Sequence, residues 1–388
     1  MRPGFDRGQS SMTAPITYCT NCLEPNTRPD SNFEDDGRCL ACHIAANTGE
    51  INWPARHKEL EEIAIWGKEN CATSYDCLIP VSGGKDSLRQ SLYCRDELGL
   101  NPLLVTCAYP PQEQTDRGAA NMGNLIELGF DCIYVSPGPD TWRRLMRAGF
   151  DIWGNLNKST ELPLYATAPR VATAYHIPLV VYGENPALSW GGSGGSFDGD
   201  ANRLKYSNTL NGGDISWILD AGFDPGSLYW YTYPPDDDIH RANLRMIYLG
   251  YYISDFNDEV NASIAIDNGR TSRPGDDADP MQIGQITDFD ALDCDFIAVN
   301  QMLKAMKFGF GKVSEQCSGF IRAGLMTRDE AIELTRLYDA KCDDRFVHKV
   351  CDFIGMTYDE FWEVAERWRN HDLWVQDGND WRMKYPPE

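Results

Sequence analysis

The chain has 388 residues, which is enough for two or three domains. Asp and Glu number 58 against 35 Lys and Arg, so the formal net charge is −23. We therefore expect no binding to nucleic acid or to an anionic membrane, because both attract basic protein surfaces. Hydrophobic residues make up 42% of the chain without forming a run of roughly 18 apolar residues, so the sequence predicts a folded protein without a transmembrane helix.

The 13 cysteines are spread over the whole chain. We interpret residues 1–15 as a flexible leader, because this polar stretch lacks the apolar core of a secretory signal peptide. Many cysteines without such a signal are typical of the cytoplasm, where thiols stay reduced. We accordingly expect a cytoplasmic protein with free cysteines.

Residues 16–52 contain four cysteines that stand apart from the others, namely Cys19, Cys22, Cys39 and Cys42. They form two C-x2-C pairs separated by sixteen residues, a spacing typical of zinc sites. Four thiolates complete a tetrahedral site with no position for water, so we predict a structural zinc in a ribbon-like module. His43 follows directly but is not needed as a ligand. An iron–sulfur cluster is the alternative that the spacing leaves open.

From residue 53 onward, helices and short apolar strands alternate. Strands are expected at 76–81, 101–108, 130–137 and 178–185, and helices at 53–66, 87–98, 116–129, 140–153 and 163–177, the last one interrupted at Pro169. This alternation predicts an α/β fold with a doubly wound parallel sheet. We assign residues 53–230 to this domain and expect its first and fourth strands to be neighbours at the switch point.

A loop suited to binding phosphate follows the first predicted strand and leads into a helix. It consists of Ser82, Gly83, Gly84, Lys85, Asp86 and Ser87. The glycines let the backbone approach an anion closely, and the helix N-terminus directs N–H groups toward it. Lys85 adds a positive charge. The spacing differs from that of a Walker A loop.

Residues 231–388 are predicted to form a mostly helical C-terminal region. Thr327 and Thr357 each precede a Glu by three residues, which is the capping-box spacing at the start of a helix. Two stretches rich in turn-forming residues, 189–203 and 268–280, are expected to be mobile, the second as an exposed insertion.

The SGGKDS loop resembles the SGGxDS motif of the PP-loop ATP pyrophosphatases, a HUP-like α/β fold. With the C-x2-C pairs before it, the chain resembles the N-acetyl sugar amidotransferases of pseudaminic acid biosynthesis. The resemblance continues at 177–192, 247–252, 292–296 and 307–334. It covers residues 16–374 and is weakest at 195–245 and 268–285.

This resemblance implies an ATP-dependent enzyme that makes a bacterial surface polysaccharide or modifies flagellin. Such an enzyme adenylates the acetamido oxygen of a nonulosonic-type or related N-acetyl sugar, releases pyrophosphate, and lets ammonia displace AMP to leave an acetamidino group. The ammonia is expected from a separate glutaminase subunit. Arg2 stands where a class II glutaminase has its cysteine, and Cys317 has no elbow glycine before it.

The resemblance also assigns roles to residues at the ends of the strands. The phosphate loop, Ser82 to Ser87, is expected to bind the β and γ phosphates with Mg²⁺, and Lys85 to stabilise the departing pyrophosphate. Asp86 either holds Mg²⁺ or caps the helix. The remaining candidates are Thr106 and Gly183 for ATP, Glu184 for Mg²⁺ or ammonia, Asn185 for the substrate amide, and Trp190 and Tyr206 for the sugar.

Three other functions remain open at this point. A PP-loop sulfurtransferase would replace ammonia with sulfur, and Cys107 at the end of the second strand would then be a candidate nucleophile, although packing is the ordinary role of such a thiol. The same amidination on a specialised metabolite is the second. A nucleotide-binding module without catalysis is the third, and the presence of both Lys85 and Asp86 argues against it.

Overall fold

The computed structural model describes residues 16–191, 195–207, 210–378 and 380–388. The predicted leader at 1–15 and the middle of the Gly-rich stretch, at 192–194, lie outside the described residues. None of the helices that the structure describes combines the length and apolar character that a membrane crossing requires.

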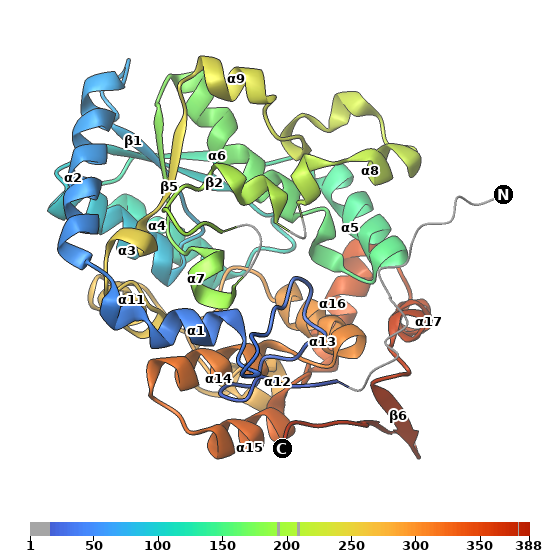
Figure 1. Ribbon diagram of the computed structural model, residues 1–388. Coiled ribbons are helices and arrows are strands. Elements are labelled where there is room, and N and C mark those ends of the chain that lie inside the picture. The colour runs from blue at the N-terminus through green and yellow to red at the C-terminus, as the bar shows by residue number, and fades with distance from the viewer. Residues whose placement is uncertain (1–15, 192–194, 208–209, 379) are drawn as a thin grey trace.

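A five-stranded parallel sheet lies at the centre of the α/β part (Figure 1), with the strand order β3-β2-β1-β4-β5. Its strands are β1 (Cys77–Pro80), β2 (Pro102–Cys107), β3 (Cys132–Val135), β4 (Leu179–Tyr182) and β5 (Arg245–Tyr248). The predicted parallel sheet is confirmed, and so is the pairing of the first and fourth strands, since Leu78 of β1 is in register with Val180 of β4.

Both faces of the sheet are covered by helices. Alternate strand residues point to opposite sides, so Ile79 and Val181 pack in one cluster while Leu78 and Val180 pack in another. The first cluster includes residues of α2 (Trp53–Asn70), α3 (Lys85–Leu92), α4 (Asp116–Glu127) and α11 (Asp258–Asp267). The second includes α6 (Glu161–Tyr175). This two-sided burial is what keeps a parallel sheet stable.

Two features of this part differ from the predictions. The sheet has a fifth strand, β5, which lies beyond residue 230 in the region expected to be helical. The apolar run of β5 continues directly into the short helix at Leu249–Tyr252, so no turn residues mark the end of a strand in the sequence. The helix expected to break at Pro169 is continuous as α6. Pro169 is buried on the sheet, and this packing outweighs the one backbone hydrogen bond that proline removes.

The remaining helices have the following bounds. They are α1 (Leu40–Ala46), α5 (Pro139–Trp153), α7 (Pro186–Trp190), α8 (Ser216–Asp220), α9 (Asp236–Arg241), α10 (Leu249–Tyr252), α12 (Pro280–Ile283), α13 (Phe296–Phe308), α14 (Lys312–Ala323), α15 (Arg328–Tyr338), α16 (Asp344–Ile354) and α17 (Tyr358–Trp368). A short antiparallel pair, β6 (Trp374–Asp377) and β7 (Asp380–Met383), follows them.

The C-terminal helices share one hydrophobic core with α5 and with residues of the segment 210–231. Phe150 of α5 stacks on Phe361 of α17 with ring centroids 4.8 Å apart, and α13 and α16 complete this cluster. Both predicted capping boxes are present, at Thr327 with Glu330 and at Thr357 with Glu360. The division of the chain into domains at 52 and 230 stays a prediction.

The N-terminal cysteine module, residues 16–52, packs against two parts of the chain. Its helix α1 contacts both α7 and α14, and Figure 1 shows the dark blue module beside α14. The side chain of Arg328 on α15 donates hydrogen bonds to the carbonyl oxygens of Cys19 and Cys22. The module is therefore anchored to α7, α14 and α15.

Candidate functional site

The four cysteines of the module converge on one point. Their ligand atoms all lie within 4.8 Å of one another, with Sγ–Sγ distances of 3.7 Å for Cys19–Cys42 and for Cys22–Cys39. Four sulfurs placed about 2.3 Å from a zinc ion lie roughly 3.8 Å apart at the corners of a tetrahedron. The geometry therefore fits a structural zinc site.

Backbone N–H groups surround the sulfurs of this site. The amides of Asn21, Cys22 and Cys39 point at Cys19 Sγ from 3.4, 3.5 and 3.1 Å, and Glu24 N lies 3.4 Å from Cys22 Sγ. Such contacts stabilise thiolates and orient metal ligands. His43 instead contacts Asp36, with Nε2 3.0 Å from Oδ1, in agreement with its exclusion from the predicted ligands.

The phosphate loop follows β1 and turns sharply into α3. Gly83 has a φ of +76°, and a Cβ there would lie 3.0 Å from the backbone nitrogen of Met122, so glycine is required at this position. Helix α3 begins at Lys85 with Gly84 as its N-cap and without a side-chain cap. Asp86 therefore does not cap the helix, which was one of its two expected roles.

Lys85 is enclosed by carboxylates from three separate parts of the chain. Its Nζ lies 3.1 Å from Asp86, 3.0 Å from Asp258 on α11, and 3.0 Å from Asp290. Only 8% of the Lys85 side chain is exposed. Burial acts to lower the pKa of Lys85, but Asp86, Asp290 and Asp258 together hold it well above its ordinary value.

Asp290 connects the loop to the C-terminal helices. Its Oδ2 accepts hydrogen bonds from Thr287 Oγ1 and from Gln316 Nε2 on α14, and Lys312 Nζ lies 3.9 Å away. Burial would raise the pKa of Asp290, but Lys312 and Lys85 shift it below the ordinary value. The carboxylate is thus a charged link between the start of α3 and the start of α14.

Arg270 reaches the same loop from the stretch 268–280. Its Nε donates to the carbonyl oxygen of Gly83 at 3.1 Å, and its Nη2 donates to that of Phe289 at 2.6 Å. Arg270 and Arg273 are only 4% and 6% exposed. The expectation of an exposed insertion is therefore wrong for these residues, because backbone carbonyls of Gly83, Phe289 and Ala291 accept hydrogen bonds from guanidinium groups that the sequence alone places in water.

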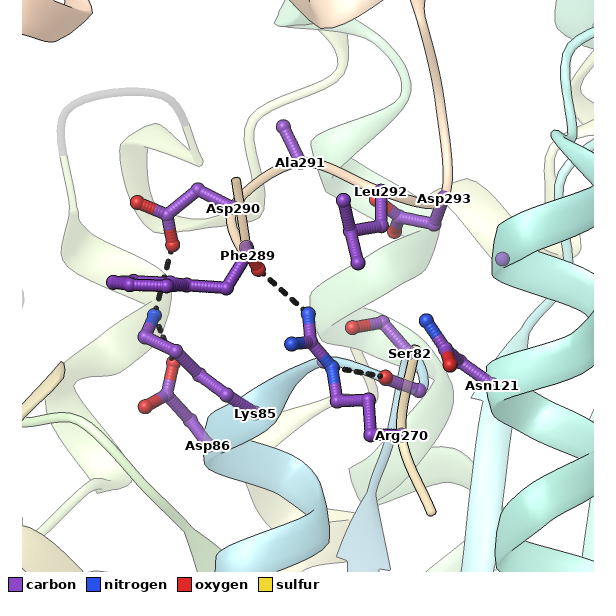
Figure 2. A pocket seen from close by; sticks show the side chains of 13 residues that line it. Ser82, Lys85, Asp86, Asn121, Arg270, Phe289, Asp290, Ala291, Leu292 and Asp293 are labelled. Atoms are coloured by element: carbon purple, nitrogen blue, oxygen red, sulfur yellow. Dashed lines mark hydrogen bonds and ion pairs between the residues drawn. The ribbon is translucent and has the colours of Figure 1, made fainter. Parts of the chain in front are cut away.

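A cavity of about 160 Å³ lies between the loop and the segment 289–293 (Figure 2). It is lined by Ser82, Gly83, Gly84, Lys85, Asp86, Gly118, Asn121, Arg270, Phe289, Asp290, Ala291, Leu292 and Asp293. Backbone N–H groups at a helix start, a lysine and an arginine meet here, which is a combination suited to an anion. We refer to this cavity as the phosphate-loop pocket.

Glu184 follows β4, the neighbour of β1, and the charged groups around Lys85 affect its pKa. Its side chain is reached by solvent but is crowded by protein atoms, and this desolvation, with Asp86 and Asp258, raises its pKa to about 8. Lys85 and a hydrogen bond with Ser189 oppose the shift. A carboxyl group that titrates near neutral pH is suited to general acid–base chemistry.

Asn185, by contrast, is 2% exposed and holds the loop together. Its Oδ1 accepts from Ala187 N and Ser196 N, and its Nδ2 donates to Ser196 O at 2.8 Å. These contacts cap α7 and fix the chain beyond it. Asn185 thus has a structural role here, and its expected contact with the substrate amide stays a prediction.

The other predicted residues have different environments. Gly183 is tightly packed, since a Cβ would lie 2.8 Å from Gln90 and Phe256. Thr106 is buried, and burial raises the pKa of Cys107 to about 12, which fits packing rather than a nucleophile. Ser87 donates to Gly84 O, Ser82 is exposed, and the Tyr206 side chain is 53% exposed. The Trp190 side chain lies outside the described part.

Four residues around Lys85 and the loop were not predicted from the sequence, namely Asp258, Arg270, Asp290 and Lys312. Each comes from a segment at least 170 residues beyond the loop, so no spacing rule connects it to Lys85. The sequence does indicate a helix start at 257–259. Asn257 caps α11 there, and this helix start places Asp258 beside Lys85.

Comparisons with known proteins match one part of the chain. Residues 283–385 fit a family described as LPS biosynthesis protein WbpG-like, C-terminal domain. This match covers about a quarter of the chain, from the end of α12 to β7, and includes Asp290, Lys312 and Gln316. A search of curated proteins finds no match to the chain.

Proposed function

We propose that this protein is an ATP-dependent amidotransferase of bacterial surface-sugar biosynthesis. It would convert an acetamido group of a nonulosonic-type or related N-acetyl sugar to an acetamidino group. The observation that carries the proposal is the SGGKDS loop at the end of β1, with a cation and carboxylates around it and Glu184 on the adjacent strand. The match of residues 283–385 to an LPS biosynthesis family supports the substrate class.

The loop and Glu184 would act on the two ends of one reaction. The loop would hold the β and γ phosphates, with Lys85 stabilising the charge that develops on pyrophosphate as it leaves. Asp86 and Asp258 approach Lys85 from the solvent side, with 35% and 55% of their side chains exposed. They are the carboxylates that would hold Mg²⁺, which would neutralise the phosphates.

The acetamido oxygen would attack the α-phosphorus, so that an O–P bond forms while the bond to pyrophosphate breaks. Ammonia would then add to the activated carbon and displace AMP. Glu184 would accept the proton that the nitrogen loses in this step. The ammonia would come from a separate glutaminase subunit.

The test is the set of products formed from ATP, ammonium and acetamido sugars. We expect AMP and pyrophosphate in equal amounts, formed only when both the sugar and a nitrogen source are present. Formation of ADP and phosphate would contradict the proposal. If a sulfur donor, but not ammonium, supported AMP release, the sulfurtransferase alternative would replace it.

A further inference from the structure

Lys85 is already engaged by carboxylates. Its Nζ donates hydrogen bonds to Asp86 and Asp290 and forms an ion pair with Asp258 at 3.0 Å. Asp290 is also held by Gln316 and Thr287. An anion at Lys85 would compete with these carboxylates for its positive charge, so a second cation in the pocket would strengthen anion binding.

Arg270 supplies this second cation. A guanidinium group has five N–H donors, and two of its nitrogens are occupied by the carbonyls of Gly83 and Phe289. The third nitrogen, Nη1, is buried and has no hydrogen-bond partner among the described residues. Within that part of the chain Arg270 also forms no salt bridge, unlike Lys85.

The unpaired nitrogen belongs to a side chain that lines the phosphate-loop pocket. Arg270 lines this cavity, and Figure 2 shows Nη1 on the side where Lys85 and Asp86 lie, opposite Asn121. A buried N–H group without a partner costs free energy, and its retention in a polar cavity indicates that a ligand supplies the missing acceptor. A guanidinium anchored by two carbonyls is fixed in position before the ligand arrives.

We propose that Arg270 is a phosphate-binding residue, whose Nη1 donates to the pyrophosphate portion of ATP and to released pyrophosphate. This inference rests on the proposed function and extends it to a residue outside the loop. The fixed guanidinium would bind the anion together with Lys85, which the buried Asp290 carboxylate keeps oriented. Only ligands with a β-phosphate would reach Arg270, so AMP would not contact this residue.

The experiment is calorimetric titration of the full chain with magnesium pyrophosphate and, separately, with AMP. In Arg270→Gln we expect pyrophosphate to bind roughly 10- to 100-fold more weakly, the range for losing one charge-assisted hydrogen bond, with AMP affinity unchanged. Arg270→Lys keeps a cation at the site, so its fold is preserved. It should still lose about tenfold, because one ammonium cannot replace the fixed fork.

The matched control is Arg369→Gln, a buried arginine at the end of α17 that is 8% exposed and does not line the cavity. This variant should bind pyrophosphate as the wild type does. Wild-type affinity in both Arg270 variants, or equal losses for AMP and pyrophosphate, would overturn the inference. If the selective loss occurred in a protein that releases ADP from ATP, the anion site would stand while the proposed AMP-forming reaction failed.

Discussion

The cysteine module and the phosphate-loop pocket both gather ionisable side chains, but they differ in whether those side chains satisfy one another. The module brings four thiols around a single point and surrounds them with N–H groups, so one metal ion would satisfy every sulfur. The pocket places Lys85 among three carboxylates and leaves one nitrogen of Arg270 unpaired. One metal ion would therefore satisfy the thiol site, whereas the pocket keeps an unpaired N–H group that a ligand would satisfy.

The two regions are also connected through α14. Leu23 N of the module donates to Ser318 Oγ at 3.2 Å, and Lys312 and Gln316 of the same helix hold Asp290 of the pocket. The cysteine module therefore supports α14, the helix that holds Asp290 in the phosphate-loop pocket. The supporting role of the module and the reacting role of the pocket can be tested by substituting residues of each region separately.

The largest effect on catalysis is expected from Lys85→Ala, which should lower AMP formation by roughly 10²–10³-fold or more. The change also leaves Asp290 buried with a weaker partner, at a cost to stability of about 3 kcal/mol. Adding Asp290→Asn removes that buried charge. We expect the double variant to regain melting temperature but not activity, which would separate the catalytic role of Lys85 from its role in stability. Regained activity would remove Lys85 from the mechanism. Lys58→Ala, at a lysine whose side chain is 77% exposed, is the control.

The largest effect on stability is expected from Cys39→Ser. It should abolish zinc binding and destabilise the module by several kcal/mol, since structural zinc contributes on the order of 10 kcal/mol of binding free energy. Because α1 contacts α7 and α14, a partial loss of activity should accompany the loss of metal. Metal analysis and thermal melting measure this, with Cys71→Ser as the control outside the cluster. A variant that keeps one zinc per chain would show that these cysteines are not the ligands.

A smaller effect, but one with a defined pH dependence, is expected from Glu184→Gln. The pKa of Glu184 rises from the ordinary 4.5 to about 8 on folding. Near pH 4 and below, both states carry the proton and the group does not affect stability. Between pH 4.5 and 8 the unfolded state loses its proton first, so the wild type becomes progressively less stable.

The Gln variant lacks this loss, so its advantage in melting temperature should grow from nothing near pH 4 to a maximum above pH 8. Its turnover should fall by roughly 10²-fold, the lower end of the range for a general acid–base residue, while ATP binding persists. Asp198→Asn, at a carboxylate of the neighbouring exposed stretch, serves as the control for the loss of a surface charge. A melting difference independent of pH would show that Glu184 is not a perturbed acid.

The contrast between the two regions explains what the sequence could reveal. The module was predictable because its ligands lie within 24 consecutive residues, from Cys19 to Cys42. The parallel sheet was predictable because apolar strands and amphipathic helices alternate. The partners of Lys85 were not, because Asp290 lies 205 residues away and only tertiary packing brings it to the loop. The burial of Arg270 depends in the same way on carbonyl groups of Gly83 and Phe289.

The most direct test of the central claim, adenylation of the substrate at the phosphate loop, uses a sugar labelled with oxygen-18 in its acetamido group. The wild-type protein is incubated with this sugar, ATP, magnesium and ammonium, and the products are analysed by mass spectrometry. If the amide oxygen attacks the α-phosphorus, the label is transferred to AMP. Label found only in water or pyrophosphate would contradict the account.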